Sequence, residues 1–218
     1  VSLDPDIIPS QSPPASLTLT RDDAQERELA SYFLGNGLSR SELSGGVQTY
    51  DGSDGAAVFQ ADGSFEISAG YLPVEDPEAF CADFCRQFGY QDLTFSLEDG
   101  SGSAAAVQYF DGFPVINATV TFSFDAGTLV TVTGTHLPET AQPVSPSSQP
   151  LSAAAALNAF LSARRETGAV VRSVLAVDLC YELQSSTAVP MTLTPSWRIS
   201  TDTVTYHVDC ITGAVTHG

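Results

Sequence analysis

The chain has 218 residues and a net charge of −18 at pH 7, and all eight of its basic residues are arginines. Proteins bind phosphates mainly by neutralising them with lysine and arginine, so nucleic acids and anionic membrane surfaces are excluded as favoured partners. A chain of this length can bury a stable core without a metal or a disulfide. We therefore expect no cofactor.

The first 16 residues are rich in proline and serine, which predicts a disordered N-terminal linker at 1–16. Such a start is typical of a chain cut just after a signal peptide or a membrane anchor, and an arbitrarily trimmed cytosolic domain is the alternative. No run of about 18 apolar residues occurs, so the chain as given is not expected to cross a membrane. We expect it to act outside the cytoplasm, secreted or anchored by a missing N-terminal helix.

The next elements predict a first helix-plus-sheet unit at 17–72. A helix is expected from Thr20 or Asp22 to about Gly35, with an apolar stripe that faces a core. The dipeptide Asp62-Gly63 predicts a tight hairpin, because both positions tolerate positive φ. The stripe consists of Leu29, Tyr32 and Phe33, and the strands are expected at 47–50, 56–60 and 64–68.

A second unit is expected at 73–138. It opens with the helix that has the clearest start and stop signals in the chain. Asp76 can cap this helix, Pro77 suits its first position, and Gly89 can end it. Phe80, Phe84 and Phe88 repeat at one-turn spacing and face a core. Strands are expected at 93–98, 104–110, 115–124 and 128–135, and Val120, Phe122 and Phe124 alternate with hydroxyl side chains.

A polar linker is expected at 139–150, followed by a C-terminal unit at 151–218. Its helix runs from Ser152 to Gly168, where Arg164 and Arg165 complement the helix dipole. Strands are expected at 170–183, 197–200 and 204–210. Together these elements predict an α+β fold of repeated helix-plus-antiparallel-sheet units, with helices packed on one face of each sheet.

The stretch from Gln108 to Val115 contains Tyr109, Gly112 and Pro114. With the following strands and the turn at 125–127, it resembles the Y-x-x-G-x-P-V, G-x-V and V-x-G pattern of thermolysin-type protease propeptides. Gly112 and Pro114 also have ordinary structural roles, because glycine permits turns and proline fixes an extended strand entry. We take all three as candidate interaction or structural residues.

The stretches 193–199 and 206–215 contain Trp197, Arg198 and Tyr206, which are further candidate interaction or structural residues. The C-terminal unit resembles a PepSY repeat, and these stretches look like extracytoplasmic regulators of the YycH and YycI type. That resemblance implies a membrane-anchored signalling domain whose partner is a membrane sensor kinase, and the composition makes this domain acidic. Neither resemblance supplies a catalytic residue.

Catalytic and metal-binding patterns are weak in this sequence. No nucleophile motif, zinc-protease motif or phosphate loop occurs. His207 and Asp209 share a strand face and give a weak zinc or calcium signal, and the loop 51–55 is interpreted as a turn rather than a calcium site. We expect no catalytic, cofactor or metal residues.

The four cysteines do not show whether the protein belongs to an oxidising or a reducing compartment. Cys81 and Cys85 stand four apart on a helix, where two buried thiols are favoured over a bridge. Cys180 and Cys210 lie in predicted strands, where a disulfide is an alternative to two free thiols.

The sequence thus favours a non-catalytic regulatory domain outside the cytoplasm that binds a protein, either a sensor kinase or a protease. Recognition is expected through a sheet edge or a complementary patch. A protease inhibitor or propeptide-like folding assistant is one alternative, and a sensor of small ligands is another.

Overall fold

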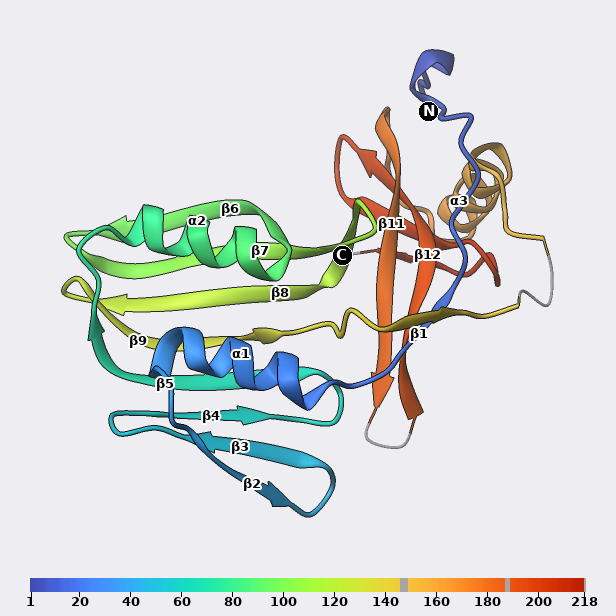
Figure 1. The fold of residues 1–218 in the computed structure, drawn as a ribbon. Coiled ribbons are helices and arrows are strands. Elements are labelled where there is room, and N and C mark those ends of the chain that lie inside the picture. Colours follow the sequence, from blue (N-terminus) through green and yellow to red (C-terminus); the bar gives the residue numbers. More distant parts are fainter. Residues whose placement is uncertain (146–148, 187–188, 218) are drawn as a thin grey trace. The chain divides into compact units, whose positions relative to one another are not determined.

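The computed structural model describes residues 1–145, 149–186 and 189–217 (Figure 1). Within these ranges it contains fourteen strands, three α-helices and one 3-10 turn, η1 (Pro5–Ile7). The chain divides into two compact units. The large unit comprises Leu19–Ala141 with Leu183–Met191, and the small unit comprises Val1–Thr18, Gln142–Glu182 and Thr192–Gly218.

The large unit contains an antiparallel sheet in the strand order β2-β3-β4-β5-β9-β8-β7-β6. Short hairpins join most neighbouring strands, and the Asp62-Gly63 turn is formed as predicted, with φ of +88° at Gly63. The strands are β2 (Ser39–Leu43), β3 (Val47–Asp51), β4 (Ala56–Phe59), β5 (Ser64–Pro73), β6 (Tyr90–Glu98), β7 (Ser101–Phe110), β8 (Phe113–Asp125) and β9 (Thr128–Thr135).

Two helices cover one face of this sheet, α1 (Asp23–Leu34) and α2 (Pro77–Phe88) (Figure 1). Their ends follow the predicted signals: Asp22 caps α1, Asp76 caps α2, and Gly89 adopts the left-handed conformation that ends α2. The helices and the sheet share one apolar core. It includes Leu29 and Phe33 of α1, Phe84 of α2, and Phe122 of β8.

The small unit is built around α3 (Ala153–Thr167) and most of the long strands β11 (Val174–Ser186) and β12 (Val189–Thr201), whose residues from Leu183 to Met191 belong to the large unit. Strand β12 also pairs with β1 (Leu17–Leu19) and β13 (Thr205–Asp209), and β13 pairs with β14 (Val215–His217). The short strand β10 (Ala141–Pro143) lies at the boundary between the units in the sequence. As predicted, α3 begins after Ser152 and ends at Gly168.

The predicted fold of repeated helix-plus-antiparallel-sheet units, with helices on one face of each sheet, is wrong. Strand β5, expected to close a first unit, pairs directly with β9 over Ser64–Ser68, so the strands of both expected units form a single sheet. Tyr32 of α1 also packs on Phe80 and Phe84 of α2, so the two helices share one core. More of the described residues lie in strands than in helices. The predicted domain boundaries themselves stay a prediction.

Among the described residues, no helix combines the length and the apolar character needed to cross a membrane.

Candidate functional site

The edge strand β6 is the first feature of the large unit that could bind another molecule. This nine-residue strand is hydrogen-bonded to β7 along one side, and no other strand of the described large unit pairs with it. Its register shifts between Gln91 and Thr94, where Asp92 adopts a positive φ of 55°. The Tyr109 hydroxyl donates a hydrogen bond of 2.7 Å to Asp92 Oδ2 and braces this bulge. The remaining edge of β6 offers backbone groups to a partner.

A pocket of about 390 Å³ opens beside the start of β6, where Gly89 precedes Tyr90. Four segments of the large unit line it: α1, the C-terminal end of α2, the end of β7 with the β7–β8 turn, and the segment after β9. Gln108, buried on β7, connects two of these walls. Its Oε1 accepts a hydrogen bond of 2.9 Å from Leu137 N, and its Nε2 donates to Phe88 O at 3.4 Å. The walls of the pocket are therefore held in place by the fold.

His136 contributes an unusual group to this pocket. Both of its ring nitrogens are buried, and neither has a hydrogen-bond partner in the described part of the chain. Burial lowers the pKa of His136 to about 4, although the negative charge of Asp22 opposes that shift. The ring is therefore neutral at pH 7, with one N–H donor and one bare acceptor nitrogen. Buried polar groups without partners are rare in folded proteins, which marks this side chain as a candidate ligand contact.

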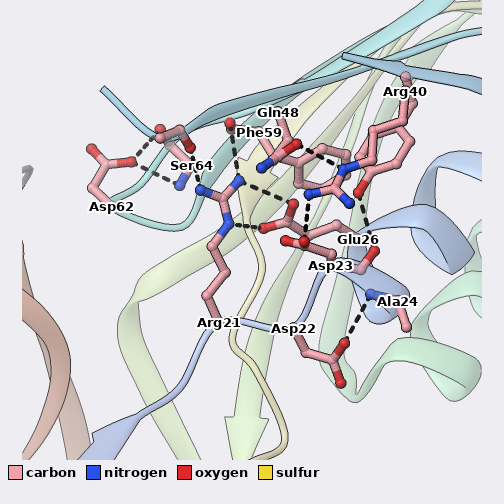
Figure 2. Close-up of polar contacts among 12 residues, drawn as sticks. Arg21, Asp22, Asp23, Ala24, Glu26, Arg40, Gln48, Phe59, Asp62 and Ser64 are labelled. Carbon is pink, nitrogen blue, oxygen red and sulfur yellow. Dashed lines mark hydrogen bonds and ion pairs between the residues drawn. The ribbon is translucent and has the colours of Figure 1, made fainter. Parts of the chain in front are cut away.

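A polar cluster around Arg21 holds the start of α1 against the sheet (Figure 2). The Arg21 guanidinium binds both carboxylate oxygens of Glu26, at 2.5 and 3.0 Å. It also donates to the carbonyl oxygens of Gly46 and Phe59. Because these bonds join α1 to β4 and to the β2–β3 turn, the cluster positions the helix that supplies one wall of the pocket.

Inside this cluster, burial and the charge of the ion-pair partner shift the pKa of each group in opposite directions. Burial lowers the pKa of Arg21, but the hydrogen bond and charge of Glu26 outweigh it and raise that pKa overall. Burial raises the pKa of Glu26 more than Arg21 lowers it. Close by, Arg40 donates to Asp23 at 2.5 Å and to Gln48 at 2.9 Å (Figure 2). The cluster is a structural clamp rather than an open site.

The structure places three of the candidate residues, Tyr109, Gly112 and Pro114, together at the β7–β8 turn. Gly112 occupies the turn with φ of +82°, and Pro114 is buried opposite Tyr109 in the sheet register. Of these three residues, Tyr109 alone lines the pocket.

The other three candidates lie on neighbouring strands of the small unit. Trp197 is fully buried, and its indole nitrogen donates a hydrogen bond of 2.8 Å to Leu151 O. Arg198 lies 3.4 Å from Asp178, and the buried Tyr206 packs on Phe160 with 4.8 Å between ring centroids. The Tyr206–Phe160 contact holds α3 to the strands, the Trp197 bond fixes the segment just before α3, and the Arg198 pair joins β12 to β11.

Cysteine and metal chemistry has little support in the described residues. All four cysteines are buried free thiols, as predicted for Cys81 and Cys85. Burial raises the pKa of Cys81 and of Cys180 to about 12, so both thiols are protonated at neutral pH. No group of three histidine, cysteine, aspartate or glutamate side chains that could hold a metal ion occurs in the described ranges. Asp209 instead accepts hydrogen bonds from the backbone of the following turn.

Sequence reasoning missed His136 and the Arg21–Glu26 pair. Nothing next to His136 distinguishes it from an ordinary residue after a strand, because its burial depends on α2 and β7. A signal for the pair was present, since Arg21 lies just before α1 and Glu26 lies in its first turn. That spacing alone could not show that the sheet covers both groups.

The fold is similar to that of an uncharacterised protein from Eubacterium rectale ATCC 33656, known from a crystal structure. The two are 9% identical, the match covers 95% of this chain and 81% of that one, and the TM-score is 0.50. The C-terminal domain of Bacillus megaterium YpeB is 11% identical over 90% of this chain and 97% of that domain, with a TM-score of 0.42. The first likeness concerns the fold alone, and the second carries no argument about this chain.

No protein-family model matches the sequence, and no curated protein is similar to it. Neither of the two similar structures is named as a YycH- or YycI-type regulator or as a protease propeptide. Those resemblances stay predictions.

Proposed function

We propose that the chain is a non-catalytic binding domain that acts outside the cytoplasm and holds an extended, basic segment of a partner protein along β6. The observation that carries this proposal is the nine-residue β6 edge, which is paired on one side only within the described large unit. An extended peptide can add to such an edge as a further strand, because the free backbone groups of the edge supply the hydrogen bonds.

The two edges of the large-unit sheet differ in how well they are protected. The opposite edge, β2, has only five residues and carries Arg40 and Glu42, whose charges discourage strand addition. Strand β6 is longer and contains no lysine, arginine or proline. Its Phe95 is also 37% exposed on the helix-covered face of the sheet. The β6 edge is therefore the better docking position for a strand.

Charge indicates the chemistry of the partner. No lysine or arginine occurs between Arg86 and Arg164, a stretch that includes β6 and its two neighbours in the sheet. Asp92, Glu98 and Asp99 lie on β6 or in the turn that follows it. A segment that adds to this edge gains electrostatic attraction when it carries lysine or arginine.

A non-catalytic role is supported by the state of the groups that could act as nucleophiles or bases. The buried thiols are protonated at neutral pH, and His136 has no partner among the described residues that could orient it. The extracytoplasmic location rests on the resemblance of 108–215 to propeptide and PepSY sequences. Detection of the natural protein in cell fractions tests it, and recovery in the cytoplasm would contradict it.

Strand addition is tested by selecting random peptides on the full chain and measuring the Kd of the synthetic winners by calorimetry. We expect basic peptides of alternating pattern that slow amide hydrogen exchange in β6. Ser96→Lys places a cation on the exposed β6 edge and should weaken binding at least tenfold. Ser41→Lys makes the same change on the exposed β2 edge and should leave Kd unchanged.

Peptides that bind the Ser96→Lys and unaltered chains equally well would contradict the proposal. So would protection of β2 in place of β6, or a selection that yields no binding peptide.

A further inference from the structure

The pocket beside β6 has a distinct chemical character that strand addition does not explain. It is preorganised, because the buried Gln108 side chain bonds both to the end of α2 and to Leu137 after β9. Its volume of about 390 Å³ lies within the range of small-ligand sites. The pocket therefore has the size and the rigidity of a binding site.

The charged groups that line the pocket are mostly negative. Glu28, Asp111 and Glu139 bring three carboxylates, and Arg86 brings one positive charge. The Arg86 guanidinium already lies 2.7 Å from Asp83 Oδ1, on the same helix. Negative potential in the pocket therefore exceeds positive potential, and this favours a cation over an anion.

The uncharged lining suits the stem of such a cation. Phe88 and Tyr109 supply aromatic surface, which packs against aliphatic chains and attracts a positive charge over a ring face. The neutral imidazole of His136 neither repels a cation nor has its nitrogens occupied by the described residues. Its bare nitrogen can accept a hydrogen bond from an N–H group that enters beside Phe88, whose ring centroid lies 6.4 Å away.

We propose that this pocket binds one cationic nitrogen group, an amine or a guanidinium carried on an aliphatic stem. The group belongs either to a free small amine or to a lysine or arginine side chain of a polypeptide. Carboxylates at the rim attract the charge, aromatic rings enclose the stem, and His136 accepts a hydrogen bond. This assignment does not depend on strand addition at β6.

The experiment titrates the full chain with three ligands, followed by calorimetry and by the ¹⁵N resonances of the His136 ring. The ligands are agmatine, the blocked peptide Gly-Gly-Arg-Gly-Gly, and the same peptide with uncharged citrulline in place of arginine. We expect agmatine or the arginine peptide to bind and to shift the His136 resonances. The citrulline peptide should bind at least tenfold more weakly.

Matched variants distinguish binding in the pocket from nonspecific attraction of a cation to the acidic chain. Glu139→Gln removes a carboxylate of the pocket and should weaken binding at least threefold at low ionic strength. Glu75→Gln removes an exposed carboxylate just before α2, on neither the pocket lining nor β6, and should leave binding unchanged. Both changes alter net charge equally and affect exposed side chains, so folding should survive them.

If agmatine binds as tightly as the arginine peptide, the cationic group belongs to a free small amine. If the peptide binds tenfold tighter than agmatine, the group belongs to a polypeptide. Equal binding of the citrulline and arginine peptides would overturn the proposal. Equal weakening by Glu75→Gln and Glu139→Gln, or binding without any shift of the His136 resonances, would also overturn it.

Discussion

The two units of the chain differ sharply in charge although each has four arginines. The large unit carries 19 acidic residues and a net charge of −15, whereas the small unit carries seven and a net charge of −3. Every arginine of the large unit makes an internal contact: Arg21 with Glu26, Arg40 with Asp23, Arg86 with Asp83, and Arg27 over the Tyr50 ring. Most carboxylates of the large unit are thus left for solvent or for a basic partner.

The difference fits the binding role proposed for the large unit. Charge of one sign on one unit raises the association rate of oppositely charged partners and opposes compact folding through self-repulsion. The large unit offsets that repulsion with its aromatic core, in which Phe84 contacts Phe33, Phe88, Tyr90 and Phe122. We therefore interpret the large unit as the binding unit.

The largest expected effect on the free energy of unfolding comes from truncating a side chain in the core of the large unit. Phe84→Ala empties a fully buried site and should lower the free energy of unfolding by about 4 kcal/mol. Urea denaturation measures the loss, and amide hydrogen exchange locates it in α1 and α2. Phe160→Ala, at a fully buried site of the small unit, is the matched change and should reduce protection in α3. Equal loss of protection in α3 on Phe84→Ala would show that the two units unfold as one.

The next effect concerns the arginines of the large unit. Arg21→Met leaves the buried Glu26 carboxylate without its ion pair and should cost about 3 kcal/mol of folding free energy. Arg86→Met breaks an exposed pair and should cost less than about 0.5 kcal/mol. Adding Glu26→Leu to Arg21→Met should recover much of the loss in thermal or urea unfolding. Equal costs for the two arginine changes would mean that the Arg21 clamp does not stabilise α1.

The smallest of the three effects is a dependence on pH. Because the pKa of His136 is lowered from 6.5 to about 4, the unfolded chain binds a proton at higher pH than the folded chain does. The resulting stability is present above pH 6.5 and is lost as pH falls toward 4. Between pH 7 and pH 5 the loss should be about 2 kcal/mol.

This pH effect is measured as the difference between the unaltered chain and His136→Leu, in which other titrating groups cancel. In the small unit, burial and the neighbouring Arg198 also lower the pKa of the half-buried His207, so His207→Leu should change the slope in the same direction but less. An unchanged slope in His136→Leu would show that the imidazole is not buried in a neutral state.

Local signals predicted the elements well and the candidate site poorly. The caps at Asp76 and Ser152 and the glycines at 89 and 168 bound their helices as expected, because capping depends on groups within one turn. The strand alternation of Val120, Phe122 and Phe124 is likewise confirmed by their burial. The pocket was not predicted, since its four walls are far apart in the sequence.

By itself, the sequence determined where the helices and most strands lie, which of their faces are apolar, and how acidic the chain is. Those properties depend on neighbouring residues or on composition. Only the tertiary structure decided that β5 pairs with β9, that α1 and α2 share one core, and that His136 is buried without a partner among the described residues. Strand pairing and burial depend on long-range packing, which no local pattern encodes.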